Sequence, residues 1–161
     1  MGVPLEMSLA FQKNLTPAVA SPEWPLGEQT DSKLEISVVF TSVAWTIAAL
    51  KRAAVLADQL GARITLLVPQ VVPYPLPLTS PPVLLAFNER RFRLIASESP
   101  VETRVNIYLC REPFETVKAI LKGRSLVVLG GRRGRWWPTA EQRLAGKLRR
   151  SGHEVVFAET E

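Results

Sequence analysis

The stretch ISVVFTSVAWTIAALKRAAVLADQLGARITLLVP, residues 36–69, decides the fold of this chain. It begins with ISVVF, a β-branched apolar run that predicts a strand buried on both faces. Apolar residues then recur at helical spacing from Ala44 to Leu60, and Gly61 stands where a helix C-cap glycine belongs. A second buried strand, ITLLV at 64–68, follows. A strand–helix–strand unit of this kind predicts a parallel sheet covered by helices.

The same alternation continues to the end of the chain. We expect helices over 83–97, 113–121 and 139–150, and strands over 104–109, 126–129 and 155–158, with a proline-rich loop over 69–82. In the helix over 83–97, the expected buried residues are Leu84, Phe87, Phe92 and Ile95. The order β-α-β-α-β-α-β-α-β predicts an α/β fold, a five-stranded parallel sheet with helices on both faces, of the Rossmann-like or adenine-nucleotide-hydrolase-like class.

Composition narrows the class of protein. With 161 residues and 47% hydrophobic residues, the chain has the size and make-up of one globular domain. No apolar run approaches the ~20 residues that span a bilayer, and the N-terminus does not follow the signal-peptide pattern. The single cysteine, Cys110, excludes an intrachain disulfide, which fits a reducing compartment. We therefore expect a cytoplasmic protein with no membrane partner.

The first 33 residues differ from the rest of the chain. They contain four prolines and no sustained apolar period. We interpret residues 1–33 as a flexible N-terminal extension and residues 34–161 as the α/β domain.

The run SLVVLGGRRGRWW, residues 125–137, is the strongest functional signal. Its buried strand ends in Gly130 and Gly131, and glycines allow a tight turn and close approach to a ligand. Three arginines follow directly, at the strand end where open α/β sheets bind ligands. Residues 132–150 include seven basic residues and one acidic residue, a net charge of +6, whereas the whole chain carries +5. The run predicts a site for an anion or a nucleotide.

These residues also have structural interpretations. Arg132, Arg133 and Arg135 form either an anion site or a solvated loop. Trp136 and Trp137 either stack on a base or pack one ring into the domain or an interface, and packing is the commoner role for such a pair. The sequence is compatible with both roles for the arginines and both roles for the tryptophans.

Other candidate residues favour structural roles. Ser42 and Thr46 either touch a ligand or cap the helix that follows the first strand, and capping is the commoner role. Thr139 is expected to cap the last helix. His153 and Cys110 have no clustered metal ligand or catalytic partner in the sequence, so we expect them to be structural. No nucleophile elbow, P-loop, metal-ligand spacing or carboxylate pair is present. The sequence therefore gives no enzyme signature.

Residues 35–159 resemble the universal stress protein family. Residues 36–69 are similar to its first strand, first helix and second strand. The segment CREPFETVKAIL, residues 110–121, is similar to the end of its third strand and the helix that follows. The segment SLVVLGGRRG, residues 125–134, is similar to its fourth strand and glycine turn. The resemblance implies a sheet of order 3-2-1-4-5, with the first and fourth strands adjacent in the middle, and a homodimer paired through the last strand. In nucleotide-binding members, ATP lies at the ends of the first and fourth strands.

The family's ATP motif is present here only in its first half. The motif is glycine, two residues, glycine, nine residues, then glycine with serine or threonine. Gly131 and Gly134 match its first two glycines, but Leu144 and Ala145 stand where the second half belongs. Thr41 stands where the family has an aspartate at the end of the first strand.

The resemblance thus implies a degenerate site for ATP, another adenine nucleotide or another anion. Its expected residues are Thr41, Ser42, Gly130, Gly131, Arg132, Arg133, Gly134 and Arg135. On this basis we expect a small binding or regulatory module with weak nucleotide affinity. Two other functions are also compatible with the sequence. One is a dimer scaffold or partner-binding domain without a ligand, and the other is a nucleic-acid-associated protein that uses the basic segment 132–150 and its tryptophans.

Overall fold

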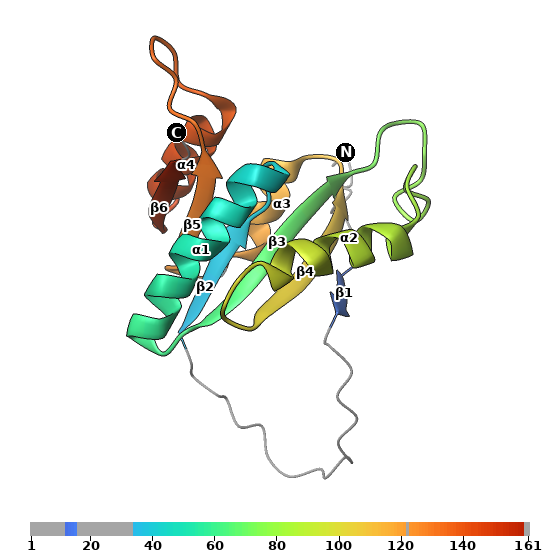
Figure 1. Ribbon diagram of the computed structural model, residues 1–161. Helices are drawn as coiled ribbons and strands as arrows, with labels where there is room; N and C mark the ends of the chain where they lie inside the picture. Colours follow the sequence, from blue (N-terminus) through green and yellow to red (C-terminus); the bar gives the residue numbers. More distant parts are fainter. Residues whose placement is uncertain (1–11, 16–33, 122, 160–161) are drawn as a thin grey trace, which may run out of the picture.

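A computed structural model describes residues 12–15, 34–121 and 123–159. Its six-stranded sheet has the order β1-β4-β3-β2-β5-β6 (Figure 1). The strands after β1 are β2 (Glu35–Val39), β3 (Arg63–Val71), β4 (Thr103–Cys110), β5 (Leu126–Gly131) and β6 (Glu154–Glu159). These five pair in parallel. In the numbering of the predicted strands their order is 3-2-1-4-5, so the predicted sheet and the adjacency of its first and fourth strands are confirmed.

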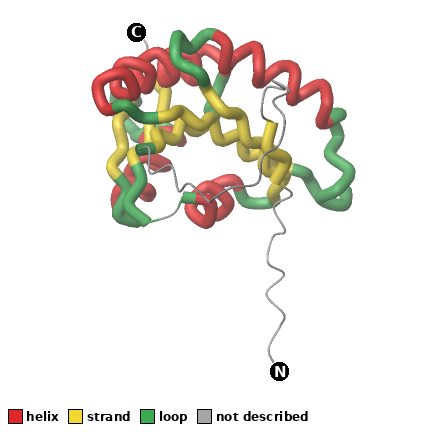
Figure 2. Tube along the Cα trace, turned by 90° about the horizontal axis from the view of Figure 1, so that it is seen from below, coloured by secondary structure: helices red, strands yellow, loops and turns green. Residues whose placement is uncertain are grey.

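Four helices cover the sheet, in the order α1 (Val43–Leu60), α2 (Leu85–Ser97), α3 (Pro113–Ile120) and α4 (Ala140–Arg150). Helices lie on both sides of the strands (Figure 2). Alternate strand residues divide the core between the two faces: Val38 and Leu66 pack in one apolar cluster with α1 and α2, whereas Val39 and Leu67 pack in the other with α3 and α4. This alternation follows from the two-residue period of a strand. None of the helices in the described ranges combines the length and apolarity needed to cross a membrane.

Local signals in the sequence set the ends of two helices. Helix α1 begins after Ser42, whose Oγ accepts a hydrogen bond from the Trp45 amide at 3.4 Å, and it ends at Gly61 in the left-handed region with φ of 63°. Helix α4 begins after Thr139 in a capping box completed by Gln142. The predicted caps Ser42, Gly61 and Thr139 are therefore confirmed.

The inner face of α2 differs from the prediction. Phe92 and Ile95 are buried as expected, but Leu84 is 80% exposed and Phe87 is 62% exposed. The residue that faces inward one turn before Phe92 is the polar Asn88, whose Nδ2 donates to Gln70 Oε1 at 2.9 Å. Because a hydrogen bond satisfies this buried amide, a polar residue occupies the inner face, and Leu84 and Phe87 turn to solvent.

Strand β1 (Gln12–Leu15) was not predicted. It pairs antiparallel with β4, with Gln12 opposite Tyr108 and Leu15 opposite Val105. Four residues inside a proline-containing segment show too little alternation to reveal a strand. The rest of segment 1–33 lies outside the described residues, and its interpretation as a flexible extension stays a prediction.

Candidate functional site

The carboxyl ends of the two central strands are joined by a hydrogen bond. Val39 of β2 is opposite Leu129 of β5, so the two strands end side by side. Just beyond, Thr41 Oγ1 donates to the carbonyl oxygen of Gly130 at 3.0 Å, and the Thr41 amide donates to Thr46 Oγ1 at 3.2 Å. Thr41 therefore links β2 to β5 where the resemblance places a nucleotide-binding aspartate.

Close contacts with neighbouring elements account for two of the predicted site glycines. A Cβ built on Gly130 would lie 1.8 Å from the carbonyl oxygen of Trp45, in the first turn of α1. A Cβ on Gly131 would lie 2.8 Å from Phe157 Cζ and 2.9 Å from Glu141 Cβ. Any side chain at these positions would push α1, α4 or β6 away from the end of β5. Both glycines therefore have a packing role that needs no ligand.

The segment after β5, Arg132–Pro138, forms a loop that extends past the end of the strand (Figure 1), and we call it the Arg–Trp loop. Thr139 Oγ1 donates to the carbonyl oxygen of Arg132 at 3.1 Å, which closes the loop at its base. Gln142 Oε1 accepts hydrogen bonds from the amides of Gly134 at 3.0 Å and Thr139 at 2.9 Å. The start of α4 thus holds the loop at two points.

Gly134 lets the Arg–Trp loop fold back on itself. A Cβ built on Gly134 would lie 1.7 Å from the carbonyl oxygen of Trp137. A bulkier residue would force these two parts of the loop apart. The glycine spacing that resembles a phosphate motif therefore also serves the internal packing of the loop.

The side chains of the Arg–Trp loop point to solvent. Trp136 is 83% exposed and Trp137 is 81% exposed, so neither indole packs into the described part of the domain. Arg133 forms an ion pair with Glu159 at the end of β6. Arg132 and Arg135 are exposed, and their side chains have no hydrogen-bond or ion-pair partner within 34–121 and 123–159. The loop therefore presents two indoles and two guanidinium groups that are not paired with any described residue.

The surroundings of His153 and Cys110 fit structural roles for both residues. His153 is buried, and its Nδ1 accepts a hydrogen bond from the Ser125 amide at 3.3 Å, which ties the start of β6 to the start of β5. Burial raises the pKa of the Cys110 thiol, which suppresses the reactive thiolate. Across the described ranges, no three His, Cys, Asp or Glu residues gather closely enough to hold a metal ion.

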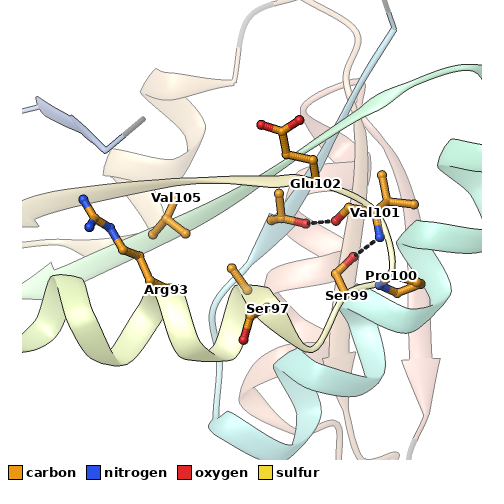
Figure 3. A pocket seen from close by; sticks show the side chains of 9 residues that line it. Arg93, Ser97, Ser99, Pro100, Val101, Glu102 and Val105 are labelled. Carbon is orange, nitrogen blue, oxygen red and sulfur yellow. Dashed lines mark hydrogen bonds between the residues drawn. The ribbon is translucent and has the colours of Figure 1, made fainter. Parts of the chain in front are cut away.

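A shallow cavity of about 300 Å³ lies between the end of α2 and the start of β4 (Figure 3). Ser99 Oγ accepts from the Val101 amide at 3.2 Å, and Thr103 Oγ1 donates to the Val101 carbonyl at 3.0 Å. These hydroxyl groups are used within the connection itself. The cavity contains none of the residues singled out in the sequence.

Three residues that shape the site were not among the predicted site residues. Gln142 holds the Arg–Trp loop, Glu159 neutralises Arg133, and the carbonyl of Trp45 lies against Gly130. Only Gln142 had a local signal, because Thr139-x-x-Gln142 is a capping-box pattern. The other two contacts join residues far apart in the chain and leave no pattern in a single sequence.

No protein-family model matches this chain. A search of curated proteins likewise finds no match for it.

Proposed function

We propose that this chain is a small binding module of the universal stress protein type that recognises an anionic, base-carrying ligand through its Arg–Trp loop. The observation that carries the proposal is the pair of exposed indoles, Trp136 and Trp137, on a loop held by Gln142. The same loop carries two exposed arginines whose side chains have no partner in the described part of the chain. Exposed aromatic groups of this size cost free energy in water and are typical of interaction sites.

The chemistry of the loop fits a nucleotide. A guanidinium group offers a planar set of donors that matches phosphate oxygens. An indole offers a flat π-face on which a base stacks. Arg132 and Arg135 supply the first group and the tryptophans supply the second. Because the loop is held at its base, little ordering is needed when a ligand binds.

The proposed ligand contacts lie on the loop and not at the paired carboxyl ends of β2 and β5. At these strand ends, the Thr41–Gly130 hydrogen bond and the approach of Trp45 to Gly130 already bring protein groups together. The acidic partner and phosphate-binding hydroxyl of the family are replaced by Thr41 and by Leu144–Ala145. We therefore propose weak mononucleotide binding, with a Kd near millimolar, or about −4 kcal/mol. As part of the same function, we propose that the protein has a regulatory role in the cytoplasm.

Calorimetry with ATP and AMP at low salt tests this function. Weak binding that disappears in Arg132→Ala/Arg135→Ala is expected, while the melting temperature changes little because exposed charges contribute little to stability. The matched control is Arg52→Ala/Arg90→Ala, which removes the same charge from exposed positions on α1 and α2. Equal binding by the loop variant and the wild type would contradict the proposal.

A second candidate is a dimeric scaffold paired through β6. In the described part of the chain, β6 is the last strand of the sheet and has β5 as its sheet neighbour on one side only. An open strand edge offers unpaired backbone donors and acceptors to another strand. Sedimentation analysis tests this candidate, since a monomer at all concentrations would rule it out.

A further inference from the structure

The positive charge of the Arg–Trp loop continues along α4. Arg143, Lys147 and Arg150 are exposed and follow one another at spacings of four and three residues, so they lie on one side of the helix. Its buried residues, Ala145 and Leu148, lie on the opposite side. We call the three exposed cations the α4 basic face.

The α4 basic face is separate from the cations that already have backbone or acidic partners. Arg149 donates from Nη2 to the Val155 carbonyl at 3.0 Å, and Arg133 pairs with Glu159. Within the α4 basic face, Lys147 Nζ lies 4.6 Å from the centre of the Phe114 ring, which keeps its ammonium group at the surface beside α3. The two loop arginines precede α4 in the chain, so they and the α4 basic face together offer five exposed cations, which we call the basic track.

The direction of this track favours a flexible polymer. Because β5 and β6 are parallel, α4 runs from the carboxyl edge of the sheet back toward its amino edge. From Arg143 to Arg150 the helix rises by about 10 Å. The cations of the α4 basic face are spread along this length, so a flexible strand can contact them one after another.

The tryptophans favour unpaired bases. Trp136 and Trp137 expose most of their ring surface, and stacking requires a base whose face is free. Bases in a duplex already stack on one another, so their faces are not available without unstacking. An acidic peptide would satisfy the cations but would leave the indoles without stacking partners.

We propose that the Arg–Trp loop and the α4 basic face together bind single-stranded nucleic acid. The two indoles stack on bases, and the five cations of the track contact successive phosphates. This inference rests on the proposed function, because it uses the same loop, and it adds α4 and the polymeric nature of the ligand.

The test is fluorescence anisotropy of the full chain with labelled dT12, with unlabelled dTMP as competitor. We expect dT12 to bind about 100-fold more tightly than dTMP, because several phosphates and two stacked bases contribute at once. With five phosphate contacts, the logarithm of affinity should fall with the logarithm of salt concentration with a slope of about −3.5. The duplex dT12·dA12 should bind more weakly than the single strand.

The decisive variant changes the α4 basic face to glutamine, Arg143→Gln/Lys147→Gln/Arg150→Gln. It should weaken dT12 binding by about tenfold and reduce the slope to about −1.4, because two contacts remain. Binding of dTMP should not change. The control variant, Lys51→Gln/Arg52→Gln/Arg90→Gln, removes the same charge from the other side of the sheet, and circular dichroism checks that both variants fold.

A second variant, Trp136→Ala/Trp137→Ala, should weaken dT12 binding by more than about tenfold. The inference fails if dT12 binds no more tightly than dTMP, or if the control variant loses as much affinity as the α4 variant. It also fails if vesicles containing phosphatidylserine bind and dT12 does not. If dTMP still binds in these cases, the inference fails and the proposed function stands. If the wild type binds neither dT12 nor dTMP, both the inference and the proposed function fail.

Discussion

Replacing Gly130 with alanine should destabilise the domain strongly. The added Cβ would lie 1.8 Å from the Trp45 carbonyl oxygen, so α1 must move away from β5. Overpacking of this kind costs roughly 1–3 kcal/mol. The same movement strains the hydrogen bond from Thr41 Oγ1 to the Gly130 carbonyl, and a lost hydrogen bond adds about 1 kcal/mol. We expect the free energy of unfolding to fall by about 3 kcal/mol.

Urea denaturation measures this change, and Gly146→Ala is its matched control. Gly146 lies inside α4, and the nearest atom to its built Cβ is Arg150 Nη2 at 3.7 Å, an ordinary contact. Alanine in that helix interior should raise stability by roughly 0.5–1 kcal/mol. In a thermal melt, Gly130→Ala should lower Tm by about 6–12 °C. A loss below about 1 kcal/mol for Gly130→Ala would refute the packing role of this glycine.

Three further predictions concern the helix cap, the loop and alkaline pH. Ser42→Ala should lower the free energy of unfolding, measured by urea denaturation, by about 1 kcal/mol. Ser42→Asp should retain most of the stability because its carboxylate also caps the helix. Gln142→Ala should speed hydrogen exchange at the amides of Gly134 and Thr139, and Gln142→Glu, which keeps an acceptor, should do so less; equal exchange in all three proteins would contradict the loop contacts. Burial raises the pKa of both the Cys110 thiol and the Tyr108 phenol, so the folded protein keeps these protons longer than the unfolded chain. The contribution of these two groups to the free energy of unfolding should therefore be constant below pH about 8.5 and should be lost as the pH rises above it. A Tm that rises from pH about 9 to about 10.5 would contradict this sign.

Much of the fold could be predicted because its signals are local. The runs ISVVF and ITLLV and the helix between them carry their periodicity in the sequence, and parallel pairing follows from the alternation of elements. The error in α2 has a physical cause. Leu84 and Phe87 share a helical spacing with the buried residues, and only the hydrogen bond between Asn88 and Gln70 shows which side faces inward.

The site could be predicted only in part, for a similar reason. Its glycines, arginines and tryptophans stand next to one another in the sequence, and the structure places them at the expected strand end. Whether a glycine serves packing or a ligand depends on atoms from distant residues, such as the carbonyl of Trp45. The difference between the paired Arg133 and its unpaired neighbours depends on Glu159, which no local pattern indicates.

The most direct test of the central claim, that the Arg–Trp loop is the binding element, is an NMR titration of indole N–H resonances. Chain labelled with ¹⁵N-tryptophan is titrated at low salt with AMP and then with dT12, and resonances are assigned by Trp→Phe substitutions. We expect the signals of Trp136 and Trp137 to shift and the signal of Trp45, whose backbone lies against Gly130, to stay in place. A shift of the Trp45 signal with those of Trp136 and Trp137 unmoved would place the ligand at the carboxyl ends of β2 and β5 and contradict the claim.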